Sequence, residues 1–155
     1  MALSTERASS SSVPRAIQWK YDVFLSFRGE DTRKRFTAHL NEELKYLGIK
    51  TFLDNPELEI GKSIPAELSS AIKQSRLAII VISPNYASST WCLDELLQIL
   101  QCMEARDTVL PIFYDLEPSD VRKQTGSFAK AFRYHKKRFD TNKLKDWKAA
   151  FNKSR

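Results

Sequence analysis

Short apolar runs alternate with longer segments of helical periodicity from residue 19 to the end of the chain. The apolar runs predict four strands, at 21–26, 49–53, 77–82 and 109–114. Between them, apolar residues spaced three or four apart predict helices at 33–47, 64–75 and 90–105. Because strands that alternate with helices form βαβ units, this pattern predicts an α/β domain with a central parallel sheet and helices on both faces.

The final part of the chain continues this pattern with shorter elements. A short or irregular helical stretch interrupted by Pro118 is predicted at 116–124, followed by helices at 128–138 and from residue 141 onward. We expect about five strands in the order 2-1-3-4-5, and the best candidate for the fifth strand is 114–121. The last helix reads as truncated where the chain ends.

Local signals suggest where the first helix begins and ends. Asp31 or Thr32 is suited to cap its N-terminus, and Gly48 is suited to end it. The run at 77–82 is wholly apolar and mostly β-branched, as expected of a strand buried on both faces. The loop at 54–63 contains Pro56 and Gly61 and is long for a connection between a strand and a helix.

The first eighteen residues differ in composition from the rest. A serine run at 9–12 followed by Pro14 lacks the apolar side chains that a core needs. We therefore predict a disordered leader at 1–18 and one folded domain at 19–155. The whole chain is 42% hydrophobic and 28% charged, which is typical of a globular protein.

The longest wholly apolar stretch has six residues, whereas about 20 are needed to cross a bilayer. The two cysteines, Cys92 and Cys102, lie ten apart in one predicted helix, about 15 Å from each other, so they cannot form a disulfide within the chain. This cysteine usage favours a reducing, intracellular compartment. We expect the cytoplasm, with the nucleus as a second location.

The net charge of +6 is concentrated at the C-terminal end. Residues 133–155 contain nine Lys or Arg and two Asp, which leaves sixteen basic and seventeen acidic residues before them. This excess suits either a solvated helix face or a surface that binds polyanions. Because no nucleic-acid-binding motif accompanies it, we expect nucleic-acid binding only as an accessory activity.

In open parallel sheets, ligands bind beyond the carboxyl ends of the strands where the winding reverses, here between the first and third strands. After the first strand this rule selects Phe27, Arg28, Gly29, Glu30 and Asp31. After the third strand it selects 83–90 and the first turns of the next helix. There Trp91 and Glu95 are four residues apart, so they share a helix face.

These residue types suit a nucleotide. Arg28 is a candidate for a phosphate, Trp91 for a base or ring, and Glu95 for ribose hydroxyls. Each also has a structural interpretation. Glu95 can complement the helix dipole in the first turn, and Trp91 can belong to the core. Arg28 can pair with Glu30 or Asp31 at the surface, and Gly29 can simply shape a turn.

Other sites known on this kind of sheet do not match. A phosphoacceptor receiver needs an acidic pair after the first strand and an aspartate at the end of the third, where this chain has Phe27, Arg28 and Ser83. The G-x-G-x-x-G of dinucleotide-binding domains is missing from the sequence, which contains only four glycines. His39 and His135 are isolated from the cysteines, so no metal site is predicted.

The sequence YDVFLSFRGEDTR at 21–33 closely resembles the opening signature of plant TIR (Toll/interleukin-1 receptor-like) domains. The resemblance continues through GIKTF at 48–52, EIGKSI at 59–64, WCLDEL at 91–96, PIFY at 111–114 and PSDVR at 118–122. It covers nearly all of residues 20–151. Such domains usually form the N-terminal module of nucleotide-binding, leucine-rich-repeat disease resistance proteins, and the resemblance implies a flavodoxin-like fold.

The resemblance also implies an activity. The glutamate of WCLDEL, here Glu95, would be the catalytic residue of an NAD+ nucleosidase that needs no cofactor and takes NAD+ or NADP+ as its substrate. Residues from Ser26 through Asp31 would line the site, and Trp91 would offer a stacking surface. Ile60 and Gly61 would close over the substrate after self-association. The products, nicotinamide and ADP-ribose-type nucleotides, would signal in plant immunity and cell death.

Two surfaces for self-association, and for binding other TIR proteins, are implied in the same way. One is the helix that carries His39, where the relatives often have Ser-His and this chain has Ala38 before His39. The other surrounds Gly126, a position that is equally explained as a loop glycine. The alternative function is a non-catalytic interaction or adaptor module, in which Glu95 is only a residue near a helix start.

Overall fold

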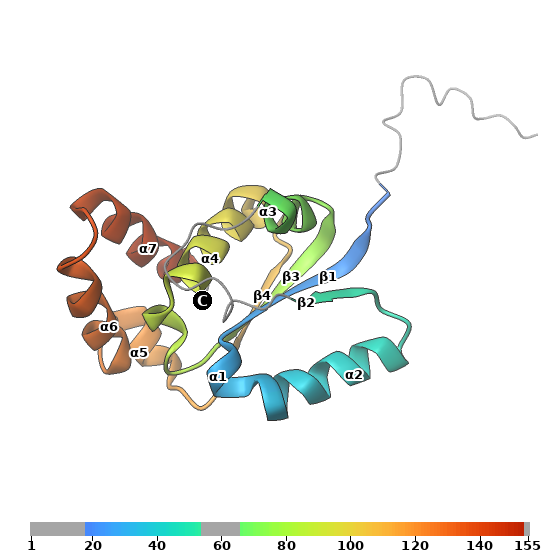
Figure 1. Ribbon diagram of the computed structural model, residues 1–155, viewed down its shortest axis with the longest axis horizontal. Coiled ribbons are helices and arrows are strands. Elements are labelled where there is room, and N and C mark those ends of the chain that lie inside the picture. The colour runs from blue at the N-terminus through green and yellow to red at the C-terminus, as the bar shows by residue number, and fades with distance from the viewer. Residues whose placement is uncertain (1–17, 54–65, 154–155) are drawn as a thin grey trace, which may run out of the picture.

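The computed structural model describes residues 18–53 and 66–153, which form a parallel sheet between two layers of helices (Figure 1). The sheet contains β1 (Tyr21–Phe27), β2 (Thr51–Leu53), β3 (Ser75–Ile82) and β4 (Val109–Phe113) in the order β2-β1-β3-β4. All three strand pairs are parallel. The α/β fold and the order of the first four strands are therefore confirmed.

In the described part of the chain the sheet has four strands, not the five that we expected. The candidate for the fifth strand instead contains the start of α5 (Pro118–Lys123). Asp115 takes a positive φ of 53° two residues after β4, so the chain turns away from the sheet. Pro118 occupies the first turn of α5, where its missing N–H costs nothing, whereas in a sheet ladder it would remove a hydrogen bond.

The first helical segment begins earlier than the sequence suggested. It comprises α1 (Gly29–Thr32), the π-helical turn η2 (Arg33–Thr37) and α2 (Ala38–Tyr46). Neither expected N-terminal cap is confirmed. Thr32 lies inside the segment, and its Oγ1 donates to the carbonyl of Arg28 (3.3 Å) and accepts from the Thr37 hydroxyl (2.6 Å), so it does not cap a backbone N–H. Gly48 does end the segment, with φ +80° and its N–H on the carbonyl of Lys45 (2.9 Å).

The remaining helices follow the predicted positions to within a few residues. They are α3 (Ala66–Lys73), the 3-10 turn η4 (Tyr86–Ser88), α4 (Thr90–Met103), the 3-10 turn η5 (Glu104–Arg106), α6 (Ser127–Lys136) and α7 (Thr141–Lys153). Both cysteines lie in α4 and neither is in a disulfide. None of the described helices has the length and apolar character that a bilayer crossing requires.

Alternating side chains of the strands build a core on each face of the sheet. On one face Val23, Leu25 and Phe27 pack with β3 residues against Phe36, Leu40 and Leu44 of η2 and α2. On the other face Phe24, Ile80 and Ile82 pack against α3, α4, α6 and α7. Residues 78–82 of β3 are all buried, so the prediction of a strand covered on both faces is confirmed.

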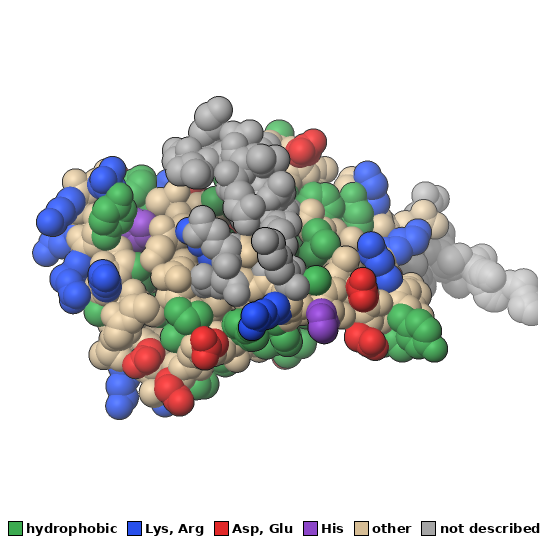
Figure 2. All heavy atoms as spheres, turned by 60° about the horizontal axis from the view of Figure 1, so that its bottom comes forward, with side chains coloured by type: hydrophobic (Ala, Val, Ile, Leu, Met, Phe, Trp, Pro, Cys, Tyr) green, Lys and Arg blue, Asp and Glu red, His purple; other side chains and the backbone are tan. Residues whose placement is uncertain are grey.

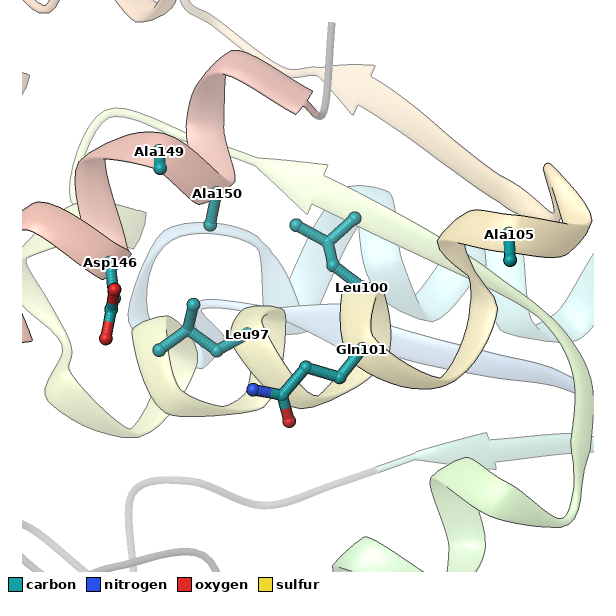
Figure 3. A pocket seen from close by; sticks show the side chains of 7 residues that line it. All are labelled: Leu97, Leu100, Gln101, Ala105, Asp146, Ala149 and Ala150. Carbon is teal, nitrogen blue, oxygen red and sulfur yellow. The ribbon is translucent and has the colours of Figure 1, made fainter.

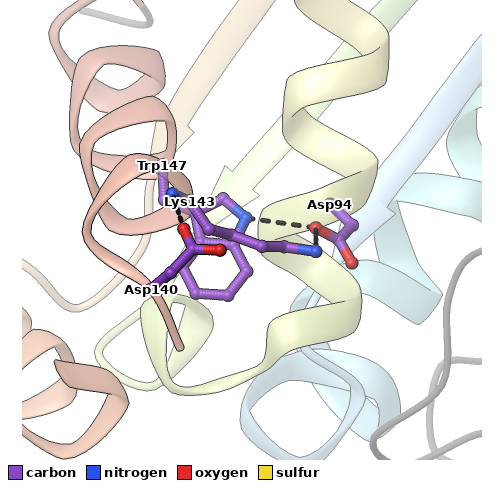
Figure 4. A network of polar contacts seen from close by, with 4 residues as sticks. All are labelled: Asp94, Asp140, Lys143 and Trp147. Carbon is purple, nitrogen blue, oxygen red and sulfur yellow. Dashed lines mark hydrogen bonds and ion pairs between the residues drawn. The ribbon is translucent and has the colours of Figure 1, made fainter. Parts of the chain in front are cut away.

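The last helix is fastened to α4 through a polar contact at its N-terminal half (Figure 4). Trp147 is fully buried, and its Nε1 donates to Oδ1 of Asp94 (3.1 Å). The Lys143 ammonium lies 3.6 Å from the same oxygen, and the Lys143 N–H donates to Oδ1 of Asp140 (2.8 Å) at the start of α7. Asp94 therefore orients α7 against α4.

His135 of α6 is buried among the rings of Phe132, Phe139 and Trp147. Its Nε2 donates to the carbonyl of Ala87 (2.8 Å), and its buried Nδ1 has no hydrogen-bond partner among the described residues. Burial lowers the pKa of His135 below its usual 6.5; the hydrogen bond to Ala87 opposes this effect and the charge of Arg138 adds to it. The fold thus favours neutral His135.

We expect the free energy of unfolding to decrease as the pH falls below 6.5. Between the unfolded pKa and the lower folded pKa, the unfolded chain binds more protons, so acid favours unfolding. Urea unfolding between about pH 7.5 and pH 5 measures the slope. His135→Gln keeps an N–H donor but does not titrate, so a variant with the same slope as the original chain would contradict this assignment.

Candidate functional site

The carboxyl ends of β1 and β3 lie side by side, as the sequence argument requires. Ser26 pairs in register with Ile80, and Phe27 pairs with Val81. The chain leaves β1 through Arg28 into α1 and leaves β3 through Ser83 into η4 and α4. The edge of the sheet thus brings together the two segments that were selected as the candidate site.

A buried hydrogen-bond chain joins these two segments. Ser26 and Tyr86 are fully buried, and Oγ of Ser26 lies 2.7 Å from the Tyr86 hydroxyl. That hydroxyl donates to the carbonyl of Cys92 (3.3 Å) in the first turn of α4. The Cys92 thiol in turn donates to the carbonyl of Phe27 (3.6 Å). The start of α4 is therefore fastened to the end of β1 at two points.

Glu95 is the buried carboxylate of this region, with 1% of its surface exposed. Ser89 caps α4, since its Oγ accepts from the N–H of Cys92 (3.1 Å). Glu95 is the sixth residue of α4, and the first turn contains no acidic residue. Because the helix dipole acts mainly within the first turn, dipole compensation is a poor explanation for Glu95.

Glu95 and the preceding residue, Asp94, differ in exposure and in their contacts. The side chain of Asp94 is 21% exposed and joins Lys143 and Trp147 of α7. Asp94 therefore has a structural role that is visible in its contacts (Figure 4). Glu95 is buried instead, and burying a carboxylate costs free energy unless the group is paired or hydrogen-bonded, so its burial calls for an explanation. A buried ionisable group at a ligand-binding edge is a functional-site candidate.

Trp91 is 4% exposed and belongs to the core cluster on the α4 face of the sheet. Its placement agrees with the structural interpretation, and the stacking role stays a prediction. Trp91 and Glu95 are both buried on one side of α4, as their spacing predicted. They therefore belong to a single region, whichever role the indole has.

The other predicted residues are only partly described. Arg28 is half-buried between β1 and α1, and Gly29 is buried as the first residue of α1. Glu30 and Asp31 lie in α1, and their side chains are outside the description. Ile60 and Gly61 lie outside the described residues altogether. Their proposed roles in the site stay predictions.

Sequence reasoning missed Tyr86. The polar segment after β3 reads as an ordinary loop, whereas the structure buries its tyrosine completely and uses the hydroxyl to join β1 to α4. An aromatic residue within a run of small polar residues was the available signal, because a buried tyrosine usually carries its hydroxyl to a partner. The contacts of this hydroxyl needed the tertiary structure.

Two surface grooves lie beside α7, away from the predicted site. One, of about 350 Å³, runs between α4 and α7 and is lined by Leu97, Leu100, Gln101, Ala105, Asp146, Ala149 and Ala150 (Figure 3). The other, of about 270 Å³, lies between α6 and α7 and includes Arg133, Lys136 and Lys148. Neither is lined by a residue that we predicted for the site.

The C-terminal basic residues gather at the end of the molecule formed by α6 and α7 (Figure 2). Arg133, Lys136, Lys137 and Arg138 are all exposed there. Lys148 is also exposed, and its ammonium lies 5.6 Å from the centroid of the Phe132 ring. These basic side chains therefore form an exposed basic surface at this end of the molecule.

His39, predicted to support self-association, is exposed on α2 beside half-buried Ala38. Gly126 precedes α6 with φ +61° and ψ −133°, a conformation that is essentially restricted to glycine. A Cβ there would lie 3.3 Å from Oδ2 of Asp120. Local geometry by itself therefore requires Gly126, whatever its role in an interface.

Gly126→Ala is expected to lower the free energy of unfolding by about 1–3 kcal/mol, since it forces alanine into this backbone conformation. Urea unfolding of the two chains at equal concentration measures the difference. Ala129→Gly, a change on the same helix that removes a methyl group without strain, provides the comparison for altered helix propensity. If Gly126→Ala and the original chain have equal free energies of unfolding, the backbone around residue 126 adopts another conformation at little cost in free energy, and the prediction is wrong.

Comparisons with known proteins agree with this architecture. The TIR domain family matches residues 20–154. The chain is 54% identical over 150 residues to TMV resistance protein N of Nicotiana glutinosa, covering 95% of this chain and 13% of that protein. It is 48% identical over 156 residues to disease resistance protein RPV1 of Vitis rotundifolia, covering 97% of this chain and 11% of that protein.

Among solved structures, the chain resembles the TIR domains of the activated Roq1 resistosome directly recognizing the pathogen effector XopQ. The TM-score is 0.80 at 51% identity, covering 87% of this chain and 83% of that chain. The parallel sheet and its helical layers thus define the flavodoxin-like class of α/β domains. Within that class, this chain belongs to the TIR domain family. It spans 13% and 11% of the two curated relatives named above.

Proposed function

We propose that this domain is an NAD+ nucleosidase that becomes active on self-association and signals in plant defence and cell death. The observation that carries the proposal is the burial of Glu95, 1% exposed, in the second turn of α4 at the carboxyl edge of β1 and β3. The disease resistance proteins among the relatives supply the biological setting.

The reaction asks little of the protein beyond charge stabilisation. In NAD+ the nicotinamide is a pyridinium, so when its bond to the ribose breaks, it takes the electron pair and leaves as a neutral group without protonation. Positive charge develops on the ribose, a water molecule adds there, and one proton is released. A single carboxylate beside the ribose stabilises that charge and orients the hydroxyls. Glu95 would have this role.

The residues around Glu95 would bind the rest of the substrate. The half-buried Arg28 would pair with a phosphate, and Gly29 would let the backbone approach it closely. Trp91 would contact a ring with the edge of its indole, since 4% of it is exposed. Ile60 and Gly61 would close over the bound nucleotide and exclude water that the reaction does not use.

Self-association would bring several such sites together. The similarity to TIR domains seen within a resistosome supports assembly, and the surfaces that would take part are the His39 helix α2 and the Gly126 region before α6. The same surfaces would recruit other TIR proteins. The exposed basic end of α6 and α7 would add a weak, salt-sensitive affinity for nucleic acid. The cytoplasm, and the nucleus as a second location, would be the place of action.

The alternative is a non-catalytic interaction module. The observation that favours it is the core packing of Trp91, which leaves little of the indole for stacking. In such a module the α2 surface and the Gly126 region would bind other TIR domains, and Glu95 would serve only the fold.

Nicotinamide release from NAD+ by the purified chain, measured over a wide range of protein concentration, separates the two functions. An assembly-dependent enzyme releases nicotinamide at a rate that rises faster than in proportion to protein. His39→Ala, an exposed position on α2, should shift that rise to higher concentration without changing the thermal midpoint. If folded protein releases no nicotinamide even at very high protein concentration, the nucleosidase function is wrong and the interaction module remains.

A further inference from the structure

Tyr86 has an unusual place for a residue in a connecting turn. It lies in η4 between β3 and α4, and none of its surface is exposed. Its hydroxyl meets Oγ of Ser26 at 2.7 Å and the carbonyl of Cys92 at 3.3 Å. Since the single phenolic proton goes to Cys92, the Ser26 hydroxyl donates its own proton to Tyr86. Both contacts are then satisfied at once.

The two partners of Tyr86 flank the candidate site. Ser26 is the penultimate residue of β1, next to Phe27 and directly before the turn that carries Arg28. Cys92 lies between Trp91 and Glu95 in the first turn of α4. A contact shared by these two residues sets the distance between the end of β1 and the start of α4. That distance is the width of the site in which Arg28 and Glu95 would hold one nucleotide.

Packing from outside the site holds Tyr86 in place. The carbonyl of the next residue, Ala87, accepts a hydrogen bond from Nε2 of His135 on α6 (2.8 Å). The Phe151 ring of α7 packs edge-on against the Tyr86 ring with centroids 6.1 Å apart. The ring therefore has little freedom to follow a shift of its hydroxyl partners. It acts as a rigid spacer between β1 and α4.

We propose that Tyr86 is a positioning residue for the nucleosidase reaction. Its hydroxyl holds Ser26 and the Cys92 carbonyl at the spacing that places Glu95 beside the ribose of a nucleotide bound at Arg28. This inference rests on the proposed function. Because none of the surface of Tyr86 is exposed, it would act through Ser26 and Cys92 rather than touch the reacting atoms.

Removal of this one oxygen should act on turnover more than on binding. Tyr86→Phe keeps the buried ring but leaves Ser26 and the Cys92 carbonyl without the atom that joins them. We expect kcat to fall roughly 10- to 100-fold, because small displacements of a catalytic group are costly in the transition state. KM should change by less than about threefold, since the ground-state contacts of the nucleotide lie on other residues.

The experiment compares Tyr86→Phe, Ser26→Ala and the double variant in nicotinamide release from NAD+, at a temperature where thermal melts show each chain fully folded. If both side chains act through the one hydrogen bond, the double variant loses little more than the worse single variant. Tyr134→Phe is the matched control. It removes the same oxygen from an exposed tyrosine on α6 and should leave kcat unchanged.

The possible results distinguish the positioning role of Tyr86 from the nucleosidase function on which that role depends. If the original chain turns over and folded Tyr86→Phe matches it in kcat, the positioning role is wrong and the nucleosidase stands. Fully multiplicative losses in the double variant would likewise overturn the coupling through one hydrogen bond. If activity falls only in proportion to the folded fraction, Tyr86 is merely structural. If the original chain releases no nicotinamide, both proposals fall together.

Discussion

Glu95→Gln is expected to lower nicotinamide release from NAD+ by at least roughly 100-fold, with the fold retained. Glutamine has nearly the same size and polarity, so it fills the buried position on α4, but it carries no negative charge. The positive charge that develops on the ribose would then face a neutral amide. Because the position is buried, that lost attraction is stronger than it would be in water.

The measurement is the rate of nicotinamide release at matched protein concentration, accompanied by thermal melts of both chains. Asp107→Asn makes the same carboxylate-to-amide change at an exposed position before β4, at the opposite edge of the sheet from the site. Asp107 has a φ of 55°, which asparagine also adopts readily. Full activity in folded Glu95→Gln would remove Glu95 from the chemistry and favour the interaction module.

Trp147→Ala is expected to lower the free energy of unfolding by about 3–5 kcal/mol. The indole is fully buried, packs at 5.1 Å from the Phe139 ring centroid, and donates to Asp94 on α4. Alanine would leave a cavity where α7 packs against α4 and His135 of α6, and it would remove the hydrogen bond that orients the helix. Since a domain is stable by only about 5–15 kcal/mol in total, this is a large fraction of its stability.

Urea unfolding followed by far-UV circular dichroism measures the change. Lys145→Ala, at an exposed position two residues before Trp147 on α7, should stay within about 0.5 kcal/mol of the original chain. Trp147→Phe keeps much of the apolar volume but has no N–H for Asp94, and should fall between the two. A loss below about 1 kcal/mol in Trp147→Ala would show that α7 contributes little to the cooperative core.

The periodicity of apolar residues predicted helices and strands well wherever one element buries one continuous face. The strand at 77–82 and the helix at 90–105 were predicted within a few residues, because each is long and apolar on a regular spacing. Near Pro118 the short helical stretch predicted at 116–124 is present as α5, whereas the fifth strand proposed at 114–121 is wrong. The prediction also failed at Thr32, whose hydroxyl bonds backward to Arg28 instead of capping the helix. Which backbone group a threonine hydroxyl binds depends on local geometry, and the spacing of apolar residues carries no information about it.

The candidate site was selected by topology rather than by composition. The switch-point rule selected the ends of the first and third strands, and Ser26, Arg28, Trp91 and Glu95 do lie at that edge. Spacing also placed Trp91 and Glu95 on one helix face. It could not predict that Asp94 would join α7 while Glu95 is buried, since both are acidic residues in the same turn.

By itself, the sequence determined the α/β class, the order of its elements, the likeness to TIR domains and the edge of the sheet where a ligand would bind. These follow from local spacing and chain order, which are properties of neighbouring residues. Only the tertiary structure decided that Tyr86 joins β1 to α4, that His135 braces the turn between them, and that Glu95 is buried. Those contacts connect residues up to 60 positions apart, and packing of the whole core selects them.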